Sequence, residues 1–197
     1  MRYQQTAAPT EEPVTVQDLI AHSQLGELPS DQIITARFML SAARQWVENR
    51  LSRQLVTATW QLHLDEWPDG EILIANRLPI ASISSIQYYD TAGEQQTLAA
   101  DQYVTDHSSS NRPARIKSAH GVSLPSLQLS RYNPITVTFT AGYGGREDVP
   151  LGIRHAILML AGTWYEHREN EVVGTITATI NTGVEMCLQP FDWGAYS

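Results

Sequence analysis

The chain of 197 residues has a single cysteine, few phenylalanines and no long apolar run. Because Cys187 has no second cysteine to pair with, a disulfide framework within the chain is excluded. No apolar run approaches the ~18 residues that a membrane-spanning helix requires. The opening RYQQTAAPTEEP lacks the apolar core of a signal peptide. We therefore expect a protein that has no membrane partner and is made in a cytoplasm.

Basic residues are also scarce. Thirteen basic residues stand against 21 acidic ones, which gives a net charge of −8 at pH 7. A dedicated nucleic-acid binder normally shows a basic surface, so this balance argues against that class, although DNA could still slide past the protein. Hydrophobic residues make up 42% of the chain and charged residues 17%, as in a folded globular protein. The length allows one core, with or without a small subdomain.

The residue patterns of common catalytic and cofactor sites are missing too. The glycine-rich residues 142–146 lie where a phosphate loop would lie, but they lack the lysine and hydroxyl of a P-loop. None of the six histidines has the spacing of a paired metal ligand. A hydrolase that uses Asp65 or Glu66 with Asp101 is an alternative that no motif supports. We therefore expect no catalytic residues, no metal and no cofactor.

Two long segments have helical periodicity. In residues 31–53 apolar side chains recur at four-residue steps, at Ile34, Phe38, Ala42 and Trp46. Residues 148–171 begin with a capping Asp148 and Pro150 and then place Ile153, Ile157, Leu160, Ala161 and Trp164 on one face. A shorter helix is predicted in residues 14–25. We expect the two long helices to pack on each other through Trp46 and Trp164. The residues predicted for the core are Phe38, Trp46, Trp60, Ile157 and Trp164.

The polar face of the first long helix has two interpretations. Arg37 and Arg44 are seven residues apart, and Glu48 follows Arg44 by four, so all three are predicted on the solvent side. A simple solvated face explains them. Alternatively, this face meets a polyanion or an acidic neighbour, and in the second case the three residues belong to a contact between subunits.

At residue 56 the hydrophobic period changes from 3.6 to 2. Val56, Ala58, Trp60, Leu62 and Leu64 alternate with polar residues, and ITVTFTA at 135–141 alternates in the same way. Shorter segments between them read as strands separated by turns, which predicts a small antiparallel sheet or sandwich. The expected fold is α+β. A helical bundle core of two long helices plus shorter ones carries an inserted antiparallel β domain.

The expected organisation follows from these segments. Residues 1–13 are predicted to be a flexible arm, residues 14–55 and 148–171 the helical core, and residues 56–147 the inserted β domain. Residues 172–197 form the C-terminal loop and tail.

The predicted tail contains an uncharged, β-branched run at residues 172–183 and an aromatic end. The run is predicted to be a strand or long loop that pairs with another chain, or else an internal edge strand or hairpin. Val172, Val173, Ile176 and Ile180 are its candidates for contacts between subunits. The aromatic end is interpreted as either a segment that docks in a partner or part of the core. The candidates for binding a partner are Val184, Met186, Leu188, Phe191, Trp193 and Tyr196.

Five segments, in the same order, resemble the head–tail connector proteins of tailed phages, also called adaptor or head-completion proteins. They are VTVQDLIAHSQL, LSAARQWVENRLSRQLVTATWQLHLDEWP, LPIASISSIQYYDTAGEQQTL, ITVTFTAGYGGREDVPLGIRHAILMLAGTWYEHRE and TGVEMCLQPF. The resemblance is to the subfamily with a β insertion between its helices, and it covers residues 14–193. The chain has Thr182 where that family usually has proline, and Phe191-Asp192 where Tyr-Arg is usual.

The resemblance implies a structural protein of the virion neck, made in the host cytoplasm. Such proteins form a ring, commonly a dodecamer, beneath the portal. The ring extends the DNA channel, through which double-stranded DNA passes without sequence specificity, and it receives the stopper, head-closure or tail protein. The implied function is not enzymatic. A DNA-packaging or DNA-binding accessory protein and a virion-associated hydrolase remain as alternatives.

Overall fold

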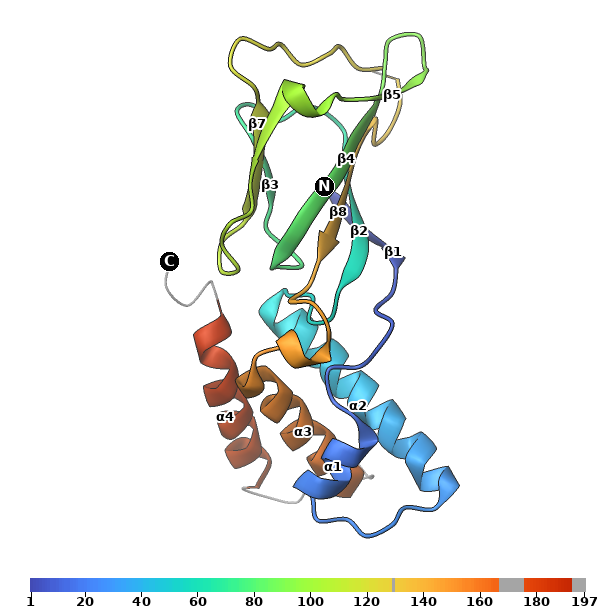
Figure 1. The fold of residues 1–197 in the computed structure, drawn as a ribbon, viewed down its shortest axis with the longest axis vertical. Coiled ribbons are helices and arrows are strands. Elements are labelled where there is room, and N and C mark those ends of the chain that lie inside the picture. The colour runs from blue at the N-terminus through green and yellow to red at the C-terminus, as the bar shows by residue number, and fades with distance from the viewer. Residues whose placement is uncertain (129, 167–175, 193–197) are drawn as a thin grey trace. The chain divides into compact units, whose positions relative to one another are not determined.

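The structure is a computed structural model that describes residues 1–128, 130–166 and 176–192, without the side chains of 176–181. The chain divides into two compact units. The first, here called the β unit, comprises Met1–Pro9 and Thr57–Tyr143, and the second, the helical unit, comprises Thr10–Val56 and Gly144–Ser197. Helices and antiparallel sheets together confirm the expected mixed α+β class (Figure 1).

The β unit contains two antiparallel sheets. The larger sheet has the order β1-β2-β8-β4-β5, with β1 Arg2–Ala7, β2 Ala58–Leu64, β8 Ile135–Ala141, β4 Ile80–Tyr89 and β5 Gln95–Thr97. The smaller sheet has the order β3-β7-β6, with β3 Ile72–Ile74, β7 Ala114–Ser118 and β6 Tyr103–Asp106.

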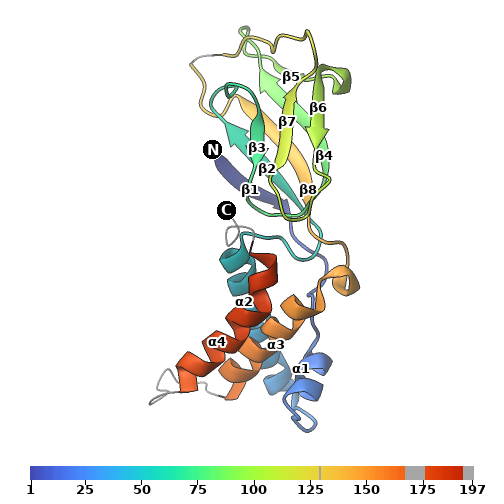
Figure 2. The ribbon, with the colours of Figure 1, turned by 90° about the vertical axis from the view of Figure 1, so that its left-hand side faces the viewer.

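The core of the β unit lies between the two sheets. The central strands β2 and β8 alternate buried and half-buried side chains along their whole length, because successive residues of a strand point to opposite faces. Trp60 lies opposite Phe139, and Leu62 opposite Val137. Ile74 of the smaller sheet belongs to the same buried cluster, so both sheets close over one core (Figure 2).

The helical unit consists of α1 Val16–His22, α2 Ser30–Leu51, α3 Leu151–Glu166 and α4 Ile176–Leu188, with the 3-10 turns η2 Arg146–Asp148 and η3 Gln189–Phe191. Helix α3 packs against α1, α2 and α4 and lies between α2 and α4 (Figure 1). The Tyr165 hydroxyl donates to Gln32 Oε1 over 2.7 Å, so the C-terminal end of α3 lies beside the N-terminal half of α2.

The N-terminal residues do not form an arm without structure. Arg2–Ala7 form β1, which pairs antiparallel with β2. The expectation was wrong because β1 is held by its backbone bonds to the edge of β2, and hydrophobic periodicity does not report such bonds. Tyr3 adds one side-chain contact, with its ring edge-on to Phe139 at 6.4 Å between centroids.

Helix α2 turns a different face to the core from the one predicted. Phe38 is 71% exposed, Ile34 69% and Trp46 37%, so the assignment of Phe38 and Trp46 to the core was wrong. The buried face instead carries Ala36, Leu40, Ala43, Val47 and Leu51. Because Ala36 and Ala43 have small side chains, the buried face of α2 allows α3 to pack closely. The helix has two apolar stripes, and periodicity alone did not show which one faces inward.

The other three residues predicted for the core differ in burial. Trp60 in the β unit and Ile157 in the helical unit are buried. Trp164 is half-buried, and its neighbour Tyr165 takes the inward position on α3.

Residues 172–183 are not a strand where the structure describes them. Helix α4 begins at Ile176, although β-branched residues have low intrinsic helix propensity. Packing outweighs propensity here, since Val184 and Leu188, one turn apart, are both buried in the helical unit.

Candidate assembly surfaces of the helical unit

Two of the predicted intersubunit residues form a partly buried ion cluster within the chain. Arg44 donates from Nε to Glu12 over 2.7 Å and from Nη1 to Glu48 over 2.6 Å. Burial alone would lower the pKa of Arg44, but the two carboxylates raise it above its ordinary value. Glu48 Oε1 also accepts from the Leu55 N–H over 3.1 Å, so the cluster ties the segments before and after α2 to the helix.

The predicted solvent face of α2 is therefore wrong at Arg44 and Glu48. Glu12 bonds to Arg44, which in turn bonds to Glu48, and the contact between Glu12 and Arg44 joins residues far apart in sequence, so helical periodicity does not show it. Arg37 is exposed. Val172 and Val173 lie outside the described residues, as do the side chains of Ile176 and Ile180.

A second cluster fixes the C-terminal end of α4 to the end of α2. The guanidinium of Arg50 donates to both carboxylate oxygens of Glu185, over 3.0 and 2.8 Å, and from Nη1 to Asp192 over 2.9 Å. The hydrogen bonds to Glu185 and Asp192 raise the pKa of Arg50 above its ordinary value. All three side chains stay partly exposed, so solvent weakens these ion pairs.

Arg53 holds the same segment from the inside. Its side chain is fully buried, and Nε donates to the backbone carbonyl of Phe191 over 2.9 Å. A buried cation requires such acceptors, because loss of hydration is costly. The Phe191 ring of η3 packs against the start of α3. A Cβ added at Gly152 of α3 would lie 3.1 Å from this ring, so the two elements are in tight contact.

The predicted partner-binding residues do not form one exposed patch. Val184 and Leu188 are buried in the helical unit, so their assignment to a docking surface was wrong. Met186 lies between them and is 69% exposed, and Phe191 is half-buried in η3. Trp193 and Tyr196 lie outside the described residues.

Sequence reasoning missed Arg50 and Arg53 because two arginines near a helix end have no distinctive spacing. The exposed stripe of α2 could have been recognised from the sequence, because the helix carries two apolar faces and a surface helix needs only one.

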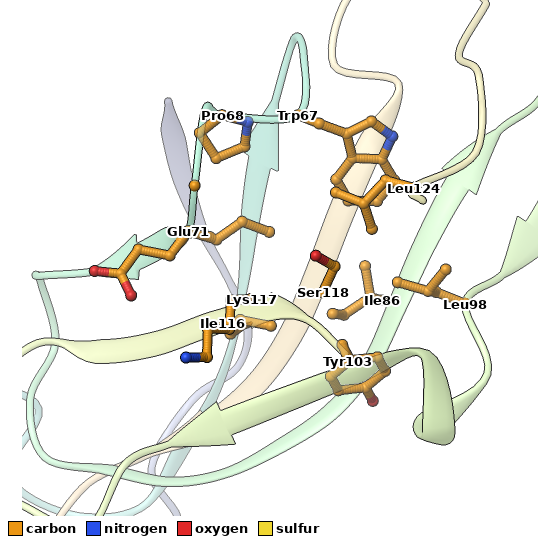
Figure 3. Close-up of a pocket in the computed structure, with 12 residues that line it drawn as sticks. Trp67, Pro68, Glu71, Ile86, Leu98, Tyr103, Ile116, Lys117, Ser118 and Leu124 are labelled. Atoms are coloured by element: carbon orange, nitrogen blue, oxygen red, sulfur yellow. The ribbon is translucent and has the colours of Figure 1, made fainter. Parts of the chain in front are cut away.

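The β unit has a small pocket between its sheets, with a volume of about 20 Å³. Trp67 and Leu124 lie at one end of it and Tyr103 at the other (Figure 3). The Trp67 indole donates to the Pro125 carbonyl over 2.8 Å, so it has a structural partner. This volume is far below the ~300 Å³ of a small ligand site, and we interpret the pocket as a gap in the core.

One of the candidate acid–base residues, Asp65, bonds to the backbone. Asp65 accepts from the Asn133 N–H over 2.9 Å. The rings of His22 and His155 stack edge-on at 5.3 Å between centroids. Within the described ranges, no group of three His, Cys, Asp or Glu side chains is placed to hold a metal ion. No helix in that part of the chain is long and apolar enough to cross a bilayer.

No protein-family model matches the chain, and no curated protein matches it either. Solved structures do match in fold. A chain from the neck of an empty GTA particle, computed with C6 symmetry, aligns with a TM-score of 0.76 at 21% identity over 95% of both chains. A chain from the neck of the native particle, computed with C12 symmetry, aligns with a TM-score of 0.71 at 20% identity, covering 97% of this chain and 94% of that one.

A third match comes from the virion of a native gene transfer agent (GTA) particle. Its TM-score is 0.73 at 23% identity, with 92% of this chain and 94% of that chain covered. Since nearly the whole length aligns in each case, both units of the chain are matched. At these identities the likeness establishes the fold.

Proposed function

We propose that this chain is a structural neck protein of a tailed, phage-like particle. Copies of it form a ring beneath the portal, extend the DNA channel and join the head to the stopper or tail. The observation that carries this proposal is the fold match to neck chains over 95% and 97% of the sequence. The C6 and C12 symmetries of those necks support a ring, and a dodecamer is the copy number we propose.

The charge of the chain suits a channel through which DNA moves. A net charge of −8 gives a surface that repels phosphate on average. Affinity for duplex DNA depends on basic residues that displace counterions, and these are few here. Double-stranded DNA would therefore pass through the ring without adhering to it.

We further propose that the C-terminal end docks on the portal. Arg50 and Arg53 fix residues 189–192, so the chain leaves the helical unit from a defined point toward Trp193 and Tyr196. A segment that is fixed before binding loses less conformational entropy when it docks. Met186 is exposed near this point and would extend the docking surface.

The test is co-sedimentation of the purified chain with portal rings from the same particle, followed by negative-stain imaging of the pellet. We expect a second ring stacked on the portal. A chain that ends at Asp192 should still form rings but should no longer bind portal. This truncation is preferable to removal of residues 184–197, which would also delete the buried Val184 and Leu188.

Three outcomes would contradict parts of this proposal. Normal portal binding by the chain that ends at Asp192 would refute docking through the C-terminal end. Failure of the full chain to associate with portal at any concentration would refute the connector role. Salt-dependent binding to duplex DNA would instead favour the accessory role in DNA packaging.

A further inference from the structure

The larger sheet of the β unit has two edges that no described strand covers. Its order is β1-β2-β8-β4-β5, so within the described part of the chain β1 and β5 each pair on one side only. All residues of β5 are exposed, and so are all residues of β1 except Tyr3. An open edge presents backbone N–H and C=O groups that can pair with a strand of another chain.

The two edges carry the same tripeptide. β1 contains Gln4-Gln5-Thr6, and β5 is Gln95-Gln96-Thr97. Each pair of neighbouring strands from β1 to β5 is antiparallel, so the direction reverses four times and the two edge strands run the same way. If a second copy placed its β5 beside β1, the strands would be parallel and identical residues could lie side by side. Parallel glutamines in register form ladders of side-chain hydrogen bonds.

The side chains of the two tripeptides also face matching sides of the sheet. Gln5 lies opposite Trp60 of the core, so Gln4 is on the face away from the core. Gln96 lies opposite a tyrosine of β4 that packs against the same core, so Gln95 is on the face away from it. A register with Gln4 beside Gln95 therefore matches both faces, whereas a slip of one residue would reverse them.

The free backbone groups of β5 follow from the bonds at the two ends of its ladder with β4. The Leu98 N–H donates to a β4 carbonyl over 2.8 Å, and the Glu94 carbonyl accepts from the residue after β4 over 3.0 Å. Bonded pairs alternate along an antiparallel ladder. Gln96 therefore bonds to β4, and the backbone groups of Gln95 and Thr97 point away from it.

The same alternation identifies the free backbone groups of β1. The Tyr89 N–H of β4 donates to the residue before β8 over 2.9 Å. Because successive residues of a strand bond to alternate sides, counting from that bond across β8 and β2 makes Gln61 the bonded partner of Gln4. The neighbours of Gln4 in β1, Tyr3 and Gln5, therefore direct their N–H and C=O groups away from β2.

These free groups fit a parallel pair in the register that the side chains require. With Gln4 beside Gln95, the Gln95 N–H would donate to the Tyr3 carbonyl, and the Gln5 N–H to the Gln95 carbonyl. The Thr97 N–H would donate to the Gln5 carbonyl. The regular pairing ends there, because β1 has a bulge after Gln5. Strand direction, side-chain faces and backbone groups thus select one register.

We propose that β1 of one copy of this chain pairs in parallel with β5 of the next copy, with Gln4 beside Gln95 and Gln5 beside Gln96. The inference rests on the ring proposed above and names a contact within it. A closed ring needs two different surfaces on each copy that meet head to tail, and the two edges of one sheet are such surfaces. Three backbone bonds make a weak contact for one pair of copies, but a ring repeats them at every interface.

The first test joins the two edges covalently. The full chain with Cys187→Ser is assembled alone or on portal rings and oxidised with copper phenanthroline. Gln4→Cys with Gln95→Cys should link neighbouring chains, because opposite residues of paired strands lie about 5 Å apart. Within one chain four strand spacings of about 4.8 Å separate these positions, too far for a disulfide.

Gln4→Cys with Gln96→Cys is the matched control, because these two side chains lie on opposite faces of the proposed pair. Non-reducing electrophoresis should show at least five times more linked chains for the first variant than for the control. Mass spectrometry of the digested product then identifies the bond.

The second test removes the backbone pairing. The Gln5 N–H points away from β2, so Gln5→Pro breaks no bond within the chain, but it removes a donor and blocks the approach of another strand. Assembly measured by native mass spectrometry should weaken at least fivefold. Gln5→Ala keeps the N–H and should weaken assembly less than twofold.

The outcomes separate this inference from the proposed function. If rings are visible by negative stain but the Gln4→Cys, Gln95→Cys variant links no better than its control, the edge contact is refuted while the ring stands. A strand of portal or tail on either edge would give that result. Equal assembly by Gln5→Pro and Gln5→Ala would refute the backbone pairing. A wild-type chain that stays monomeric both alone and on portal rings would refute the ring and, with it, this contact.

Discussion

The two units of the chain use their large apolar side chains in opposite ways. In the β unit two sheets enclose one cluster, and Trp60, Leu62, Val137 and Phe139 all face inward. In the helical unit the buried face of α2 is built partly from alanine, while Ile34, Phe38 and Trp46 point outward. The β unit buries the large apolar side chains of its central strands, although Leu73, Val104 and Tyr132 stay exposed. The helical unit leaves apolar surface over, as a subunit of a larger assembly does.

Two phenylalanines make this comparison measurable, and they carry the largest predicted effect. Phe139 is fully buried in the β unit, so Phe139→Ala should lower the free energy of unfolding of that unit by about 3–5 kcal/mol. Phe38 is 71% exposed, so Phe38→Ala should change the monomer by less than about 0.5 kcal/mol. Urea denaturation at a concentration where the chain is monomeric measures both. Similar losses at the two positions would remove the contrast between the units.

The same contrast explains what the sequence could predict. In the β unit a period of two assigns each side chain to one face, so the alternation in residues 135–141 identified the inward residues of β8 directly. Helix α2 has two apolar stripes, and the one with the larger residues turned out to face outward. Choosing between the stripes required knowing that the helical unit buries Ala36 and Ala43 and leaves Phe38 exposed.

Contacts between segments distant in sequence were beyond sequence reasoning. Glu12 reaches Arg44, and Arg53 reaches the carbonyl of Phe191, across 32 and 138 positions respectively. Neither pairing leaves a local pattern. Docking through the aromatic C-terminal end therefore stays a prediction, and the residues that fix residues 189–192 could not be predicted from the sequence.

Two arginines test whether the helical unit fixes its C-terminal end from inside. Arg53→Met keeps the aliphatic stem but removes the donor to the Phe191 carbonyl, and it should cost the helical unit about 2 kcal/mol. Arg50→Met removes partly exposed ion pairs and should cost less than about 1 kcal/mol. Hydrogen exchange in residues 184–192 should accelerate more in Arg53→Met. Equal acceleration in both variants would assign the fixing to the surface pairs.

The smallest predicted effect concerns the start of α1, which is held by a polar cap. Thr15 and Asp18 form a capping box, with the Thr15 N–H donating to Asp18 over 2.7 Å. Burial alone would raise the pKa of Asp18, but the Thr15 N–H and hydroxyl lower it below its ordinary value. The cap therefore stabilises α1 above the unfolded pKa of about 3.9, and this stability is lost as pH falls through the lower folded value.

Asp18→Asn should cost about 0.5–1 kcal/mol at pH 7 and less at pH 2, because protonation of the native carboxyl removes the same charge as pH falls through its lowered pKa. Hydrogen exchange of the α1 amides at both pH values gives the measurement. Asp90→Asn is the matched control, because Asp90 caps a turn of the β unit with bonds to the Ala92 and Glu94 N–H groups. If α1 in the wild type is equally protected at both pH values, the capping box contributes nothing. If Asp90→Asn alters α1 exchange as Asp18→Asn does, the two units do not respond to pH separately.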